Sequence, residues 1–366
     1  IISFDNPYPP NYGGVIDVYF KIKALNDLGI KIHLHCFVKE IPSEYESLKQ
    51  ITASIHFYKT TIQWFYLFSK LPISVISRKN PELVVNLLKN DAPILFEGLK
   101  TTCLINDQRL KNFNCYLRYH NIEHSYHFGI AKSETSFVRK FLFWSEAVKY
   151  KNYEKLVSRF SKTFTLSNYE NEYVNENYKN GVYIPVFHGN NQVDEISDFG
   201  KFVLFHGDLS TSDNRKAALF LIEVFKDLPN QNLVIASSFG KEIIQRAINT
   251  SPNIKFEELK DTAHLKSLFH EAHVCISWSF QKSGTKLKLI NSLFQSRHNI
   301  INENISDDFQ VISLCTLVTT KNELIESING LFQVPYDKKC IENKKQILNK
   351  TLDNEFNAKE LMKYIN

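Results

Sequence analysis

Residues 283–301, SGTKLKLINSLFQSRHNII, combine a glycine, two lysines and an apolar helical pattern. Gly284 follows a strand-like run, HVCISWSF, so the helix after it starts directly beyond a strand. Such a helix start presents backbone N–H groups and the positive end of the helix dipole. Lys286 and Lys288 lie in its first turn, where a cation is unfavourable unless an anion is near. The segment therefore predicts a phosphate site; an ordinary strand–helix unit with solvated lysines is the alternative.

Two further glycine turns follow predicted strands. Gly13 and Gly14 end the loop NPYPPNYGG after the first strand, and Gly207 follows the strand FVLFH. A glycine at the end of a parallel strand allows the backbone to approach a ligand closely. Neither turn has the GxGxxG spacing, so the dinucleotide fingerprint is absent. Together with the first segment, the three turns predict a ligand-binding cleft at the strand ends.

Several polar side chains also lie where strands end. His120 ends a strand and is followed by Glu123, which is either a functional residue or a helix cap. Glu97 ends the strand PILFE, where an acceptor contact and a structural turn are equally open. Arg78 comes after the aromatic segment 57–68, so it is a candidate for an anionic acceptor or a lipid head group. A solvated basic turn is the alternative for Arg78.

The composition does not predict a metal or a cofactor. The six cysteines have neither a CxxC pair nor a spacing to histidine that is typical of a metal site. We interpret them as buried thiols in a reducing compartment. Asp307 and Asp308 lie in a polar loop, and no DxD-type pair lies where it could hold a cation. The formal net charge of +5 suits an anionic small ligand or an acidic membrane surface and is too weak to indicate nucleic acid.

Strand and helix patterns alternate along the whole chain, which predicts an α/β fold with parallel sheets covered by helices on both faces. The strands predicted in the first half are 1–4, 31–37, 54–58, 93–97, 115–119, 162–167 and 182–184, with helices at 15–28, 81–89, 136–161 and 168–177. The second half has predicted strands at 202–206, 232–236, 254–256, 274–278 and 299–301, with helices at 214–226, 241–249 and 263–271.

The length of 366 residues suits two domains. The polar, turn-rich stretch 188–200 has no periodicity, so we place the linker there. The predicted organisation is an N-terminal Rossmann-like domain at 1–187, a C-terminal one at 201–337, and a helical tail at 338–366 that packs back on the first domain.

One apolar segment bears on the membrane. Residues 60–77, TTIQWFYLFSKLPISVIS, are interrupted by Lys70 and Pro72, well short of a clean membrane span. The segment predicts a buried helix or a surface helix that touches lipid. The first residues lack the basic region and cleavage site of a signal peptide. We expect a cytoplasmic protein, with contact to the inner face of the membrane left open.

Four segments resemble the GT-B glycosyltransferases, in particular the large retaining family 4 that uses nucleotide-sugar donors. They are PYPPNYGGVIDVYFKIKALNDLGIKIHL, LRYHNIEHSY, LFHGDLSTSDNRKAALFLIEVF and GTKLKLINSL. The resemblance spans nearly the whole chain. It implies two facing Rossmann-like domains with a cleft between them, the acceptor on the first domain and the donor on the second.

The resemblance also implies roles for single residues. His120 stands where the family has its active-site histidine, which contacts the donor sugar or stabilises the developing charge. Asn291 and Ser283 stand where the family often has two glutamates, and Asp208 stands where an arginine is usual. The donor-binding residues expected here are Gly13, Gly14, Gly207, Arg215, Lys216, Gly284, Thr285, Lys286, Leu287, Lys288 and Asn291. Weaker acceptor candidates are Glu97, Arg78 and Glu123.

The function expected from these features is sugar transfer from a nucleotide-diphosphate donor to a glycan or lipid-linked acceptor. Because no carboxylate pair for a metal is present, backbone amides and lysines would meet the charge of the leaving diphosphate. Retention of configuration and a role in surface polysaccharide biosynthesis follow from the resemblance. The alternatives are a sugar-nucleotide epimerase on the same fold and a non-catalytic protein with a decayed donor site.

Overall fold

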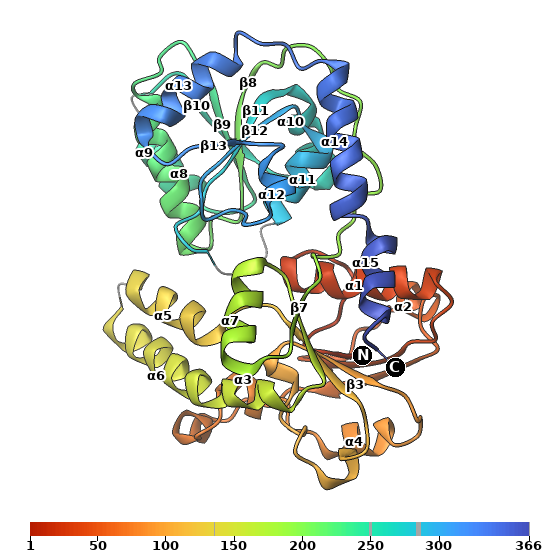
Figure 1. Cartoon of the computed structure of the whole chain (residues 1–366). Coiled ribbons are helices and arrows are strands. Elements are labelled where there is room, and N and C mark those ends of the chain that lie inside the picture. Colours follow the sequence, from red (N-terminus) through yellow and green to blue (C-terminus); the bar gives the residue numbers. More distant parts are fainter. Residues whose placement is uncertain (135, 249–250, 283–286, 366) are drawn as a thin grey trace. The chain divides into compact units, whose positions relative to one another are not determined.

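The computed structural model describes residues 1–134, 136–248, 251–282 and 287–365 of the chain. These residues form two compact units, each built on its own β-sheet with helices around it (Figure 1). Unit 1 contains Ile1–Gly189 and the end of the chain from Leu352, and unit 2 contains the described residues from Asn190 to Thr351. The predicted α/β class with two Rossmann-like sheets is confirmed.

Unit 1 has a seven-stranded sheet in the order β3-β2-β1-β4-β5-β6-β7, with neighbouring strands parallel. The strands are β1 (Ile2–Ser3), β2 (His33–Val38), β3 (Ser54–Lys59), β4 (Ile94–Glu97), β5 (Cys115–Tyr119), β6 (Lys162–Thr165) and β7 (Gly181–Tyr183). Successive side chains of a strand point to opposite faces, so each central strand contributes to two cores. Leu95 and Tyr116 belong to one core, and Phe96 and Leu117 belong to the other.

Helices cover both faces of this sheet. On the first face, α1 (Gly13–Asp27) packs against α15 (Asn354–Met362), with Val18, Ala358 and Leu361 in the core. The second face is covered by α3 (Ile73–Ile76), α4 (Pro81–Leu87), α6 (Phe137–Tyr153) and α7 (Asn168–Tyr178). The last helix of the chain is therefore part of unit 1, where it closes over the helix that follows the first strand.

Unit 2 has a six-stranded parallel sheet in the order β10-β9-β8-β11-β12-β13. Its strands are β8 (Phe202–His206), β9 (Leu233–Ser237), β10 (Ile254–Glu258), β11 (Ala272–Ser277), β12 (His298–Ile301) and β13 (Thr316–Leu317). One face is covered by α8 (Ser212–Phe225), α9 (Lys241–Ile248) and α13 (Lys321–Leu331), and the other by α10 (Thr262–Glu271). The remaining helices are α11 (Leu287–Gln295), next to α10, α12 (Phe309–Ile312) and α14 (Lys338–Thr351).

The structure contains elements that were not predicted, among them α2 (Glu46–Lys49), α13 and β13, and it differs from the predicted elements in other places. The predicted helix 136–161 ends with α6, and the chain continues as a 3₁₀ helix, η4 (Glu154–Arg159). Segment 60–77 forms an exposed 3₁₀ helix, η1 (Trp64–Phe68), before the short α3, so the prediction of a buried helix is wrong. Helix α5 (Glu123–Ser133) was considered only as the helix that Glu123 would cap, and its extent was not predicted, because EHSYHFGIAKS has no apolar stripe. Among the described helices, none is both long and apolar enough to cross a bilayer.

Candidate functional site

The strongest candidate site lies at the carboxyl ends of the two central strands of unit 1. Glu97 is the last residue of β4, and His120 follows directly after β5. These strands are neighbours, and Glu97 is in register with Arg118. Gly98 turns the chain away from Glu97 with a φ of +74°, a conformation that costs glycine little, and its amide donates to Arg118 O at 2.8 Å. The two strand ends thus bring a carboxylate and an imidazole together, at the edge where parallel sheets bind ligands.

An ion pair from helix α1 lies beneath this edge. Asp17 and Lys21 are one turn apart on the helix, and neither side chain is exposed. Lys21 Nζ lies 2.9 Å from Asp17 Oδ2, 2.9 Å from Glu97 Oε1 and 3.0 Å from Glu97 Oε2. The ammonium group is therefore shared between two buried carboxylates, one on the helix and one at the end of β4.

Arg118 extends the network into the sheet. Its Nε and Nη2 donate to the two oxygens of Asp17 at 3.0 and 2.8 Å, the paired geometry in which an arginine binds a carboxylate. Nη1 donates to Ile184 O at 2.7 Å, and the amide of Phe187 donates to Asp17 Oδ1 at 2.9 Å. The segment after β7 is thus tied to α1 and β5 by one buried aspartate.

The ion pairs keep both acids charged in the interior. Burial by itself would raise the pKa of Asp17, but Arg118 and Lys21 hold that pKa well below its ordinary value. Burial likewise opposes ionisation of Glu97, and Lys21 together with the hydrogen bond from His120 lowers its pKa. Two acidic and two basic side chains then balance, so the cluster is neutral when His120 is neutral.

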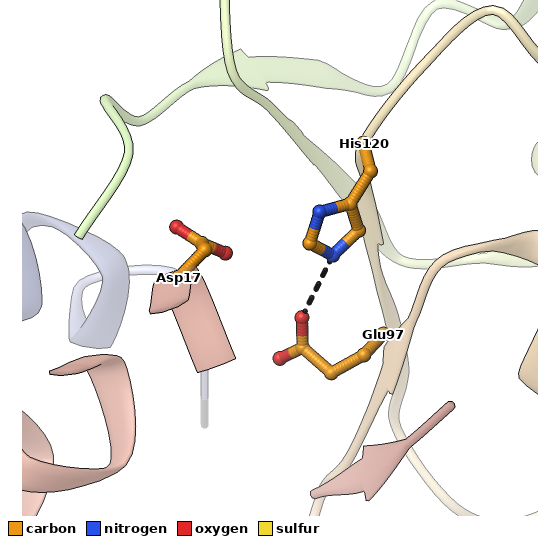
Figure 2. Close-up of side chains that lie close together, drawn as sticks. All are labelled: Asp17, Glu97 and His120. Carbon is orange, nitrogen blue, oxygen red and sulfur yellow. Dashed lines mark hydrogen bonds and ion pairs between the residues drawn. The ribbon is translucent and has the colours of Figure 1, made fainter. Parts of the chain in front are cut away.

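The environment of His120 fixes its protonation state. Burial lowers the pKa of the imidazole, and the hydrogen bond with Glu97 only partly opposes this effect, so the ring is neutral at neutral pH. Its Nε2 lies 3.1 Å from Glu97 Oε2, as Figure 2 shows. An ionised carboxylate can only accept a hydrogen bond, so Nε2 carries the proton. Nδ1 therefore has a lone pair, and it has no hydrogen-bond partner among the described residues.

Asp17, Glu97 and His120 are close enough to be considered as ligands of a metal ion, since one atom from each lies within 4.8 Å of the others (Figure 2). The donors present argue for a different arrangement. The Lys21 ammonium is bonded to both carboxylates, and Asp17 also accepts from Arg118. A divalent cation would have to displace an internal cation that already lies within 3.0 Å of both carboxylates. The cluster therefore holds a neutral imidazole whose buried Nδ1 acceptor has no partner among the described residues.

The other candidates of unit 1 lie around this centre. Arg78 is half-buried and donates to Phe4 O at 3.0 and 3.2 Å, which ties α3 to the end of β1. Glu123 is buried at the start of α5, and burial raises its pKa, while Lys100 lowers it. Gly13 and Gly14 form the first turn of α1, and a Cβ at Gly14 would come within 2.6 Å of the Phe4 ring. Packing against Phe4 therefore already explains why position 14 is a glycine.

A second group of predicted residues meets at the strand ends of unit 2. Gly207 follows β8, and a Cβ at this position would come within 3.1 Å of the Asn214 amide group. Lys288, in the first turn of α11, donates to Trp278 O at 2.6 Å and to Asn214 Oδ1 at 3.2 Å. His206 Nε2 lies 3.2 Å from Lys288 O, and burial lowers the pKa of that imidazole to about 4. The fold thus places Lys288 beside Gly207.

The remaining donor candidates have varied surroundings. Arg215 donates to Leu209 O and Ser210 O at 3.1 and 2.7 Å, so it closes the loop before α8. Lys216 Nζ lies 4.0 Å from the centre of the Phe280 ring. Leu287 is buried, and Asn291 Oδ1 accepts from Asn190 at 3.0 Å. Gly284, Thr285 and Lys286 lie outside the described residues.

Sequence reasoning missed Asp17, Lys21, Arg118 and Asn214. A signal was present for the first three, because each is a charge inside an apolar stretch, VIDVYFKIKAL or CYLRY. Such a charge is buried only with a partner. Asn214 gave no comparable signal, since an asparagine near a helix start is most simply interpreted as a cap.

No model of a known protein family matches the chain. A curated relative from Klebsiella pneumoniae, described as an uncharacterized 44.6 kDa protein in cps region, is 24% identical over 310 residues. The match covers 80% of this chain and 79% of the relative.

Solved structures show the fold. Sucrose-phosphate synthase from Thermosynechococcus elongatus is similar with a TM-score of 0.70 and 15% identity, over 99% of this chain and 97% of the other. A TarM variant from S. aureus, in complex with Fondaparinux, alpha-GlcNAc-glycerol and UDP, is similar with a TM-score of 0.69 and 10% identity, over 100% and 99%. The chain has the two-domain GT-B fold of these proteins.

Removal of the shared ammonium should strongly destabilise unit 1. Lys21→Met keeps the length of the side chain but leaves Glu97 without its cation, so we expect a loss of about 3–5 kcal/mol in the free energy of unfolding. Urea unfolding followed by tryptophan fluorescence and circular dichroism measures it. The matched control is Lys23→Met, an exposed position on the same helix, which should change stability by less than about 0.5 kcal/mol. Equal losses for both variants would contradict the assignment.

The stability of unit 1 should fall in two stages as the pH is lowered. The folded pKa of His120 lies below its ordinary value of 6.5, so stabilisation present above that pH is lost as pH falls through the folded pKa. Asp17 and Glu97 have folded pKa values below the ordinary 3.8 and 4.5, so their contribution is lost at still lower pH.

The measurement is the urea midpoint as a function of pH. His120→Gln retains a donor to Glu97 and does not titrate, so it should reduce the first stage and leave the second. Other histidines of unit 1 with lowered pKa values, the half-buried His127 and the buried His188, shift stability in the same direction, so the first stage should shrink without vanishing. If His120→Gln loses as much stability in the first stage as the unchanged protein does, His120 is charged in the folded protein.

Proposed function

We propose that the chain is a glycosyltransferase that moves a sugar from a nucleotide-diphosphate donor to a glycan or lipid-linked acceptor. The observation that carries the proposal is His120, a neutral imidazole held by Glu97 with Nδ1 unpartnered among the described residues, in a chain with the GT-B fold. The UDP bound to the similar TarM variant supports a nucleoside diphosphate as the leaving group.

Unit 2 is proposed to hold the donor nucleotide. Gly207 directly follows β8, where a side chain would meet Asn214, and Lys288 brings a positive charge to the same strand ends. A leaving diphosphate develops negative charge, which backbone amides and a lysine stabilise at a helix start. With Lys288 and Lys216 as the cations, the proposed transfer does not require a metal ion.

The proposed role of His120 is to accept a hydrogen bond from a hydroxyl of the donor sugar at Nδ1. Its pKa is lowered by burial, which makes the ring a weak base and favours an orienting contact over removal of the acceptor's proton. This supports transfer with retention, which needs no strong base on the protein. Glu97 has no exposed surface, so it acts through His120 by fixing the ring and its tautomer.

The relative in a cps region supports a role in the biosynthesis of a surface polysaccharide. Such a pathway joins cytoplasmic sugar nucleotides to acceptors at the membrane, so the proposed location is the cytoplasm, with peripheral contact to the inner face of the membrane.

Titration calorimetry with UDP and GDP tests donor binding. We expect one of the two to bind more tightly than its monophosphate, because the second phosphate reaches Lys288 and the start of α11, and we expect binding to persist in EDTA. Lys288→Ala should weaken binding by about tenfold, because it removes a hydrogen bond to a charged group, which contributes about 1.5 kcal/mol or more. Binding of neither diphosphate would contradict the proposal.

Sugar transfer tests the role of His120. With the donor that binds, His120→Ala should lower kcat by about 100-fold while the Kd of the nucleotide stays the same, because its contact is to the sugar. His56→Ala, a change on the edge strand β3, is the matched control and should leave kcat unchanged. The anomeric configuration of the product, observed by NMR, tests retention. Epimerisation of the donor without an acceptor would favour the other enzyme class.

A further inference from the structure

Helix α6 exposes the side chains that a helix normally buries. Over its 17 residues only Ala147 and Tyr150 are buried. Phe137 is 83% exposed and Phe141 59% exposed. The exposed large apolar residues of the helix are Phe137, Val138, Phe141, Leu142, Trp144 and Val148. An apolar stripe on the solvent side of a surface helix marks a docking surface.

The segment before α3 has the same character. Every residue of η1 is at least partly exposed, with Trp64 at 76% and Phe68 at 80%. The Trp64 ring lies 6.0 Å from the ring of Phe65 and 6.2 Å from that of Phe68, measured between centroids. These rings pack on one another at the surface and contribute nothing to either core of unit 1. Contact with lipid is one of the two predictions that the sequence makes for this segment.

The two exposed sets lie next to each other. Lys149 Nζ, on α6, donates to Leu67 O at 3.0 Å, and the amide of Ile73 donates to Glu146 Oε2 at 2.8 Å. Segments far apart in the chain thus form one surface of unit 1. We call the exposed apolar residues of 62–68 and 137–148 the aromatic face.

A groove runs between α5 and α6, which pack side by side in Figure 1. It has a volume of about 450 Å³. Its apolar lining includes Phe128, Phe137, Phe141 and Trp144, and two lysines, Lys132 and Lys140, also line it. The groove therefore pairs an apolar channel with positive charge, which suits a hydrocarbon chain that ends in an anionic group.

Basic residues outnumber acidic ones around the aromatic face. Arg139 lies 3.2 Å from Glu134, and Lys149 lies 2.8 Å from Glu146, so these charges offset each other. Among the described residues, neither Lys132 nor Lys140 takes part in these ion pairs or in any other. The surface therefore has an excess of positive charge beside exposed tryptophan and phenylalanine.

We propose that the aromatic face docks on an anionic phospholipid bilayer, with one lipid chain in the α5–α6 groove and its phosphate at Lys132 and Lys140. The proposal rests on the proposed function and specifies which surface makes its peripheral membrane contact. Aromatic side chains with lysines at their edge are typical of the membrane interface. Protein interfaces are depleted in lysine, which disfavours a second copy or another protein as the occupant. Anionic lipids attract each lysine near the surface.

Vesicle binding by the full chain tests the proposal. Cosedimentation with phosphatidylcholine vesicles, with and without phosphatidylglycerol, should show binding that requires the anionic lipid and weakens as salt is added. Absence of binding to both vesicle types would overturn the proposal. A dimer that Phe141→Ser converts to a monomer, without vesicle binding, would assign the face to a second copy.

Matched variants identify the surface. Phe141→Ser and Trp144→Ser should each lower the vesicle partition coefficient by about tenfold, because each removes a large apolar side chain from the contact. Lys132→Gln and Lys140→Gln should each lower it by about fivefold. The controls are Phe309→Ser, which removes a phenylalanine of unit 2 that is more exposed than Phe141 or Trp144, and Lys111→Gln, an exposed lysine elsewhere on unit 1. Equal losses in the controls would overturn the proposal.

Nucleotide binding separates this proposal from the proposed function. The surface variants should bind the nucleoside diphosphate as the unchanged protein does, which also shows that they are folded. If the protein binds vesicles but no nucleotide, the aromatic face is a membrane-binding surface and the transferase proposal is refuted. If it binds nucleotide but no vesicles, only the bilayer contact is refuted.

Discussion

The ammonium group of Lys21 lies between two buried carboxylates, those of Asp17 and Glu97, and the candidate site of unit 1 depends on this contact. An uncompensated charge in a protein interior is costly, so each of the three groups requires the others. Arg118 completes the balance at Asp17 and donates to backbone carbonyl groups beyond β7. The network therefore joins helix α1, the two central strands and the end of the N-terminal sheet.

This network also determines what His120 can do. Glu97 remains ionised because Lys21 lies against it, and an ionised Glu97 accepts the Nε2 proton of His120. The lone pair then faces away from the carboxylate at Nδ1. Lys21 binds both carboxylates of the cluster and Arg118 binds Asp17, so internal cations already engage the acids that could hold a metal ion. The same charges that stabilise the fold thus prepare a neutral acceptor at the edge of the sheet.

The sequence predicted the elements better than the contacts between them. Strands β5 and β8 have the predicted bounds, because short apolar runs between turn residues specify a buried parallel strand. Glu97 was a candidate because it ends a strand, and His120 because it lies at a strand end and matches the family resemblance. Their partner Lys21 is 76 residues away from Glu97 in the chain, and local patterns carry no information on such a pairing. Arg78 and Arg215 were candidates for ligand contacts, but whether a guanidinium binds backbone carbonyl groups depends on the folded loops.

The most direct test of this account is the tautomer and pKa of His120, measured by ¹⁵N NMR on histidine-labelled protein and assigned by comparison with His120→Gln. We expect a neutral ring at neutral pH, with the proton on Nε2 and with a pKa below 6.5. In Lys21→Met, where Glu97 loses its cation, these signals should change. A charged imidazole at neutral pH, or a proton on Nδ1, would contradict the central claim that buried ion pairs hold His120 as a neutral acceptor.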